Sequence, residues 1–191
     1  MTPEEKVKEV EAVFQKLDAE ISQFQSATGM HCKFGCGKCC FKPDIEATAL
    51  EFLPFALHLY HEGLAEQWHD KLTASNEPVC VILNPTQSGA GLCTEYKHRG
   101  LICRLFGYSA RTNKYEKKEL VTCNIIKTEE PTEYKKGVEL VENGGQIPVM
   151  SNYYMQLHAI DPEMTTTFYP INVAIKKALE NVMHYYAYRA L

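Results

Sequence analysis

Residues 32–40 read Cys-Lys-Phe-Gly-Cys-Gly-Lys-Cys-Cys, and this stretch holds four of the eight cysteines of the chain. Cys36 and Cys39 form a Cys-x2-Cys knuckle, in which two thiolates can converge on one metal ion because Gly37 permits a tight turn. Cys32 can approach from the other side of that turn. Cys40 directly follows Cys39, and adjacent side chains normally diverge. We therefore expect these two cysteines to serve different sites, or one of them to be a buried thiol.

The chain has eight cysteines among 191 residues, and all of them are candidate metal ligands. They are Cys32, Cys36, Cys39, Cys40, Cys80, Cys93, Cys103 and Cys123. A short-range knuckle followed by a long gap and later cysteines is typical of sites that close through tertiary contact. Cys80 lies in Val-Cys-Val-Ile-Leu, so it is equally compatible with a plain core thiol. Four-thiolate coordination would allow at most two sites.

Charge and compartment favour reduced, ionised thiols. The net charge is -4, yet residues 31–42 and 93–111 are each net positive, and nearby cations lower the pKa of a thiol. The first residues, Met-Thr-Pro-Glu-Glu-Lys, do not resemble a secretory signal, and no apolar run is long enough for a membrane span. We therefore expect a cytoplasmic protein whose cysteines are ligands rather than disulfides. No basic helix or aromatic-basic stripe indicates nucleic-acid binding.

Hydrophobic periodicity predicts a mainly α protein with a small β element, its helices packed around a cysteine-rich metal-binding loop region. The N-terminal helix has a capping box at Thr2 and Glu5, an apolar stripe and a stop at Gly29. Further helices are expected at 44–57, kinked or ended by Pro54, and at 64–74, 131–142, 148–160 and 170–188. Strands are expected at 79–83, within 101–110 and within 116–124, with a loop at 84–91. The prediction is one domain over 1–191, with a cysteine-rich part at about 30–125 and a helical part at about 129–191.

The cysteine pattern resembles a known family. Cys36-Gly37-Lys38-Cys39-Cys40 is similar to the signature of the CxxCxxCC family of zinc- or iron-chelating domains (YkgJ-like). Similar later elements are the cysteine before an apolar pair at 80–83, Gly-Leu-Cys-Thr-Glu-Tyr at 91–96, Arg-Gly-Leu-Ile-Cys-Arg-Leu-Phe at 99–106, and the final Cys123. The resemblance covers about residues 32–123 and implies metal or cluster binding. Cys32 and Cys36 are three residues apart where the family usually has two, and Gly100 replaces the usual proline.

Three functions remain open. The first is a metal-binding protein with zinc, or alternatively an iron–sulfur cluster, held by cysteine thiolates. The ferredoxin spacing is absent because Phe41 follows Cys40, which favours zinc. The second is a zinc- or cluster-dependent enzyme acting on a protein, since some proteins with this domain resemble flagellin lysine methylases. The third is a zinc-stabilised interaction module with a protein partner.

His31 and His98 adjoin cysteine segments and are possible accessory ligands, whereas His58 and His61 fit surface histidines.

Overall fold

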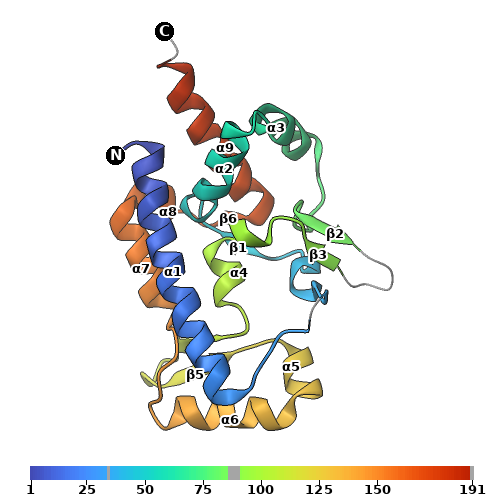
Figure 1. Ribbon diagram of the computed structural model, residues 1–191, viewed down its shortest axis with the longest axis vertical. Coiled ribbons are helices and arrows are strands. Elements are labelled where there is room, and N and C mark those ends of the chain that lie inside the picture. Colours follow the sequence, from blue (N-terminus) through green and yellow to red (C-terminus); the bar gives the residue numbers. More distant parts are fainter. Residues whose placement is uncertain (34, 86–90, 190–191) are drawn as a thin grey trace. The chain divides into compact units, whose positions relative to one another are not determined.

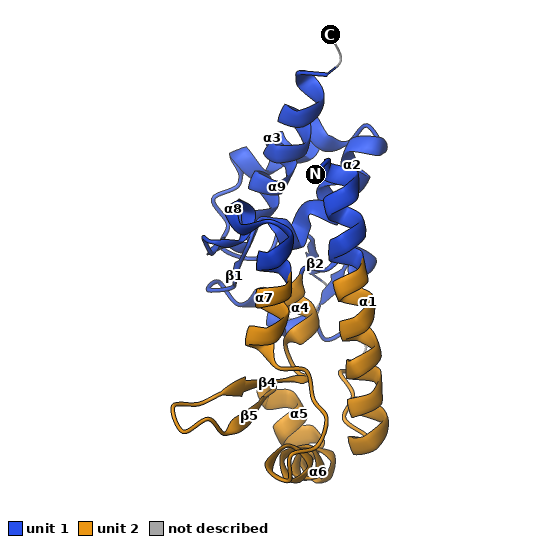
Figure 2. Cartoon of the chain, turned by 90° about the vertical axis from the view of Figure 1, so that its left-hand side faces the viewer, with its two compact units in different colours: residues 1–11, 35–100, 157–191 blue, residues 12–34, 101–156 orange. Residues whose placement is uncertain are grey.

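The computed structural model describes residues 1–33, 35–85 and 91–189 (Figure 1). These residues form two compact units, which Figure 2 distinguishes by colour. Unit 1 comprises residues 1–11, 35–100 and 157–191, and unit 2 comprises residues 12–34 and 101–156. Chain segments that are distant in sequence therefore build each unit. The expectation of one domain over residues 1–191 stays a prediction.

Helix α1 (Pro3–Thr28) begins and ends as its sequence predicts. The Thr2 amide donates to the Glu5 carboxylate at 2.8 Å, and the Glu5 amide donates to the Thr2 hydroxyl at 3.2 Å, which completes the capping box. Gly29 follows the helix with φ of 78°, a conformation that favours glycine. The apolar stripe is buried at Val10, Phe14, Leu17, Ile21 and Phe24.

Unit 1 is built on helices α2 (Leu53–His61), α3 (Ala65–Ala74) and α9 (Ile171–Ala187), with α9 packed against the other two. Short helix α8 (Pro162–Thr165) is capped by the Asp161 side chain. Strand β1 (Glu46–Ala47) pairs antiparallel with β6 (Tyr169–Pro170), which joins the segment before α2 to the start of α9.

The predicted helix over 44–57 is wrong in its extent. Strand β1 and a 3-10 turn, η2 (Leu50–Phe52), occupy its first part. Pro54 lies in the first turn of α2 and so begins a helix instead of ending one. The physical reason is that the first amides of a helix have no intrahelical acceptor, so proline loses nothing there.

Unit 2 contains α4 (Leu101–Leu105), strands β4 (Ser109–Thr112) and β5 (Lys118–Val121), and helices α5 (Asn124–Glu129) and α6 (Pro131–Glu142). Helix α7 (Met150–Ile160) follows. Strands β4 and β5 pair antiparallel, from Ser109 opposite Val121 to Thr112 opposite Lys118. The expected pairing of these two regions is confirmed, but residues 101–105 are helical rather than extended.

The strand predicted at 79–83 is also displaced along the chain. Strand β2 is Leu83–Pro85, and it pairs antiparallel with β3 (Gly91–Cys93). Part of the loop predicted at 84–91 therefore lies in strands, and residues 86–90 are outside the described residues. The apolar residues 79–82 are placed in a turn before β2.

The predicted fold class is confirmed: long helices pack together, and the described strands form three two-stranded pairs. None of the helices in the described part of the chain is long and apolar enough to cross a membrane. The cytoplasmic location stays a prediction.

Gly137 tests the packing of α6 on the end of α1. A Cβ there would lie 2.6 Å from the Met30 sulfur and 3.4 Å from the Phe24 ring. Gly137→Ala should lower the free energy of unfolding by about 1–3 kcal/mol. Alanine is the better helix former, but the steric clash of its Cβ destabilises the fold by more than the higher helix propensity stabilises it. Urea denaturation measures the change, and Lys136→Ala on the exposed side of α6 is the control. A Gly137→Ala protein more stable than the parent would contradict this tight contact.

Candidate metal centre

The two units divide the cysteines unequally. Unit 1 holds Cys36, Cys39, Cys40, Cys80 and Cys93, and unit 2 holds Cys32, Cys103 and Cys123. All eight are reduced cysteines that form no disulfide. Unit 1 alone therefore offers enough thiols for a four-ligand centre.

The glycine turn of the knuckle is seated on strand β3. Gly37 has φ of 53°, and a Cβ at this position would lie 2.5 Å from the Gly91 carbonyl oxygen. Gly35, with φ of 72°, lies against the Leu92 side chain. No other residue type fits at Gly37, because both its backbone conformation and the close approach of Gly91 exclude a side chain. The knuckle is thereby held on the strand that ends in Cys93.

The sulfur atoms of Cys39 and Cys40 lie 3.9 Å apart. Both residues are in the 3-10 turn η1 (Lys38–Phe41), which the Cys40 amide closes by donating to the Gly37 carbonyl at 2.8 Å. The expectation that these adjacent side chains diverge is wrong, because the tight turn brings them to one side. Two thiolates on one tetrahedral zinc ion, with Zn–S bonds of about 2.3 Å, are about 3.8 Å apart. The observed spacing therefore fits a shared ion.

Cys80 and Cys93 lie at the base of the β2–β3 hairpin. The Leu83 amide donates to the Cys80 carbonyl at 3.0 Å, and Leu83 pairs with Cys93 in the ladder. Cys80 is buried and Cys93 is half-buried. Cys80 interacts electrostatically with both Cys93 and Cys39, and Cys93 interacts with Cys39. Thiols from three separate segments are thus brought within electrostatic reach of one another.

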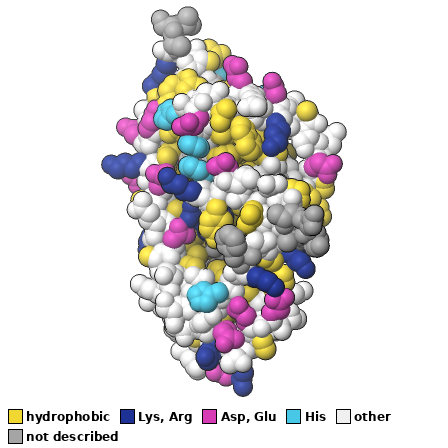
Figure 3. Space-filling model, turned by 45° about the vertical axis from the view of Figure 1, so that its right-hand side comes forward, with side chains coloured by type: hydrophobic (Ala, Val, Ile, Leu, Met, Phe, Trp, Pro, Cys, Tyr) yellow, Lys and Arg dark blue, Asp and Glu magenta, His cyan; other side chains and the backbone are white. Residues whose placement is uncertain are grey.

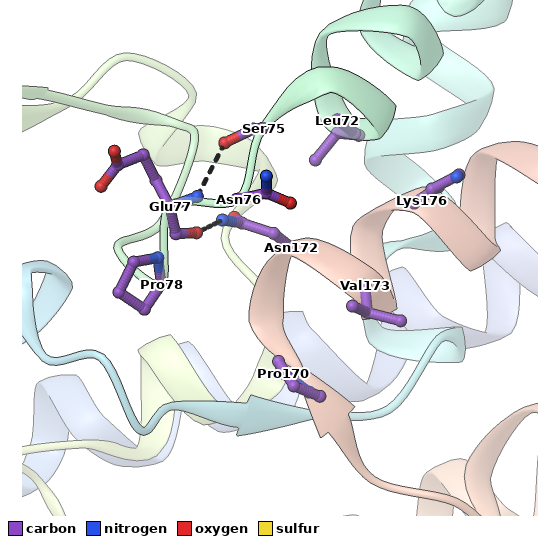
Figure 4. A pocket seen from close by; sticks show the side chains of 9 residues that line it. All are labelled: Leu72, Ser75, Asn76, Glu77, Pro78, Pro170, Asn172, Val173 and Lys176. Carbon is purple, nitrogen blue, oxygen red and sulfur yellow. Dashed lines mark hydrogen bonds between the residues drawn. The ribbon is translucent and has the colours of Figure 1, made fainter.

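Asn172, in the first turn of α9, holds the segment that carries Cys80 (Figure 4). Its side-chain amide donates to the Glu77 carbonyl at 3.0 Å and to the Val79 carbonyl at 2.9 Å. Its side-chain oxygen accepts from the Val81 amide at 2.8 Å. Three backbone groups around Cys80 are satisfied by one side chain, so a segment without regular structure is fixed on a helix.

The thiols differ in pKa. A hydrogen bond from the Cys40 thiol holds the pKa of Cys39 at about 6, well below its usual value, and backbone amides and Arg99 add to this effect. Burial raises the pKa of Cys80 to about 11, and burial also raises the pKa of Cys93. Cys39 is therefore mainly thiolate at neutral pH, whereas Cys80 must lose a proton to become a ligand.

Arg99 is the cation that acts on this cluster most directly. Its positive charge lowers the pKa of both Cys39 and Cys93. Its Nε donates to the Tyr96 carbonyl at 3.2 Å, and its guanidinium lies 3.6 Å from the centre of the Tyr96 ring. The sequence indicated local positive charge, and Arg99 provides it. Lys33, by contrast, pairs with Glu129 at 3.6 Å.

The cysteines of unit 2 have other neighbours. The Cys123 sulfur accepts from the Ile126 amide at 3.5 Å and caps α5. Cys103 lies in α4 next to Arg104, whose guanidinium pairs with Asp18. Cys32 is exposed and adds to the raised pKa of Tyr108, which is mainly due to burial. Their predicted roles as ligands stay predictions.

Another set of possible ligands involves no sulfur. Among the described residues, His58, Glu95 and His98 are the one set of three or more Cys, His, Asp or Glu residues whose ligand atoms all lie within 4.8 Å of one another, so no three described cysteine sulfurs lie that close together. The sequence indicated His98 as an accessory ligand and His58 as a surface residue, but it gave no signal for Glu95. Only the placement of α2 beside the turn after β3 joins these residues.

The fold and this cluster define a class: a helical, cysteine-rich protein with a thiol cluster of metal-binding type. Residues 31–124 match the model of the CxxCxxCC family, described as "Putative zinc- or iron-chelating domain", as the motifs predicted. The family description supports metal binding and names zinc and iron equally. The chain has no match among curated proteins and none among solved structures.

Thiol reactivity tests the pKa differences. In chelator-treated protein at neutral pH, iodoacetamide should modify Cys39 first and Cys80 last, because only the thiolate is nucleophilic. The Cys39 rate should fall as the pH drops through about 6, and the Cys80 rate should rise only toward pH 11. Peptide mass spectrometry follows each site. In Cys40→Ala the midpoint for Cys39 should move up, and an unchanged midpoint would contradict the role of the Cys40 thiol.

Asn172→Ala tests how the Cys80 segment is positioned. Three backbone groups lose their partner, so the free energy of unfolding should fall by about 1–3 kcal/mol and the affinity for metal should weaken. Denaturant titration and a competitive chelator assay measure the two effects. Val173→Ala, at an exposed position on the same helical turn, is the control. Equal effects of the two substitutions would show that the Asn172 bonds do not fix this segment.

Proposed function

We propose that unit 1 binds one zinc ion through four of its five thiols: Cys39, Cys80 and Cys93, with Cys40 or Cys36 as the fourth. The observation that carries this proposal is the 3.9 Å separation of the Cys39 and Cys40 sulfurs, with Cys80 and Cys93, from two other segments, within electrostatic reach of Cys39. Uncompensated thiolates would repel one another there, and a divalent cation converts that repulsion into attraction.

Zinc is favoured over a four-iron cluster by the short spacing of two sulfurs. The 3.9 Å separation of Cys39 and Cys40 suits two ligands of one tetrahedral ion. A four-iron cluster spreads its cysteines over different iron atoms, each with its own thiolate. A chelated zinc ion would also stabilise the fold, because it would join the η1 turn, the Cys80 segment and β3. The enzyme and interaction-module alternatives stay predictions.

Anaerobic purification followed by metal analysis and absorption spectroscopy tests the metal. The protein should be colourless and contain about one zinc ion per chain. Chelation should lower its melting temperature, since binding free energy is then folding free energy. A brown protein with iron and inorganic sulfide would show that the centre is a cluster.

Serine variants test the ligands. Cys39→Ser, Cys80→Ser and Cys93→Ser should each lose zinc, because serine keeps the size but removes the soft thiolate. Comparing Cys36→Ser with Cys40→Ser identifies the fourth ligand. Cys123→Ser is the matched control, since serine can still cap α5. Loss of zinc from Cys123→Ser would show that the centre needs thiols from outside unit 1, and retention of zinc in Cys80→Ser would remove Cys80 from the set.

A further inference from the structure

We propose that His58, Glu95 and His98 form a second metal site, which binds a divalent first-row transition ion such as Zn²⁺ without any sulfur ligand. All three residues belong to unit 1 and are half-buried, so an ion can reach them while part of their surroundings is shielded from water. Figure 3 shows several histidine side chains close together on the face in view, with acidic side chains and a basic side chain beside them.

Helix α2 supplies one ligand, His58, which lies beside other aromatic rings. Phe55 and His58 are three residues apart in α2 and so lie on the same face. The His98 ring is stacked on His58, with centroids 4.5 Å apart and planes 12° from parallel, and its centroid is 6.0 Å from that of Phe55. Phe55 is buried and packs edge-on against Trp68 at 5.2 Å. Because the two ring planes are nearly parallel and a nitrogen lone pair lies in its ring plane, at least one imidazole must turn out of the stack before both can bind one ion.

The turn after β3 supplies the other two ligands. The His98 amide donates to the Glu95 carbonyl at 2.9 Å and closes the 3-10 turn η4 (Tyr96–His98). In such a turn the side chains at positions i and i+3 lie on the same side, which places the Glu95 carboxylate near the His98 ring. The neighbouring cation Arg99 is turned onto Tyr96, where its guanidinium covers the ring.

The donor set defines the class of ion. Two neutral imidazoles and one carboxylate suit zinc and the neighbouring divalent metals, whereas soft thiolates define the other centre. The ligand atoms lie within 4.8 Å of one another, and the ligands of a tetrahedral zinc ion are about 3.3 Å apart, so side-chain rotations alone can close the site. Three protein ligands leave one coordination position open for water or a small anion.

Metal titration of the full chain as purified tests this site. Calorimetry with Zn²⁺ should show one equivalent bound in addition to the metal already present. Titration with Co²⁺ should show that this equivalent gives no sulfur-to-cobalt charge-transfer absorption. His58→Gln, His98→Gln and the nearly isosteric Glu95→Gln should each weaken binding by at least about 100-fold, since even the loss of an outer-shell partner costs 10–100-fold.

His61→Gln is the matched control, because His61 is exposed at the end of the same helix and lies outside the set. It should leave the titration unchanged. Absence of the additional equivalent, a charge-transfer band in it, or an equal effect of His61→Gln would overturn the second site. Cys80→Ser separates the two proposals: it should lose the thiolate-bound metal and still bind the sulfur-free equivalent. If His58→Gln and Cys80→Ser abolished the same equivalent, there would be one mixed site and the second site would be wrong.

Discussion

The absence of a side chain at Gly37 is the constraint on which the cysteine cluster depends. The Gly91 carbonyl occupies the place of a Cβ, so the η1 turn can lie directly on β3. That contact sets the position of Cys39 relative to Cys93, which ends the same strand. The β2–β3 pairing then brings in the turn with Cys80, and Asn172 fixes that turn on α9. The positions of Cys39, Cys80 and Cys93 relative to one another therefore depend on the close contact between Gly37 and Gly91.

The sequence predicted those parts of the fold in which local signals and tertiary packing agree. Helix α1 is long and strongly periodic, and Thr2 and Glu5 form a capping box at its start. Gly29 ends it, so both ends of this helix can be predicted from the local sequence. Helices α6, α7 and α9 are likewise bounded by glycine or proline. The knuckle and its glycine were also predictable, since a left-handed turn is a local requirement.

The errors occur where a distant partner decides the local structure. Residues 79–82 have strand propensity, yet Asn172, about 90 residues later, binds their backbone in a turn. Cys39 and Cys40 share a side because of the curvature of η1, which residue spacing alone does not reveal. Glu95 gave no signal because its ligand character depends on α2, whose His58 approaches from another part of the chain.

The two proposed sites divide one short segment between two kinds of coordination chemistry. Cys93 ends β3 and directs a soft ligand to the thiol cluster, whereas Glu95, two residues later, directs a hard oxygen ligand to the histidines. The Glu95 charge also raises the pKa of Cys93, so an ion bound by Glu95 would weaken that repulsion and favour the Cys93 thiolate. Since linkage is reciprocal, metal at the thiol cluster would in turn affect the affinity of the histidine site. If both ions bind, the Glu95 charge next to Cys93 would thus couple the two sites.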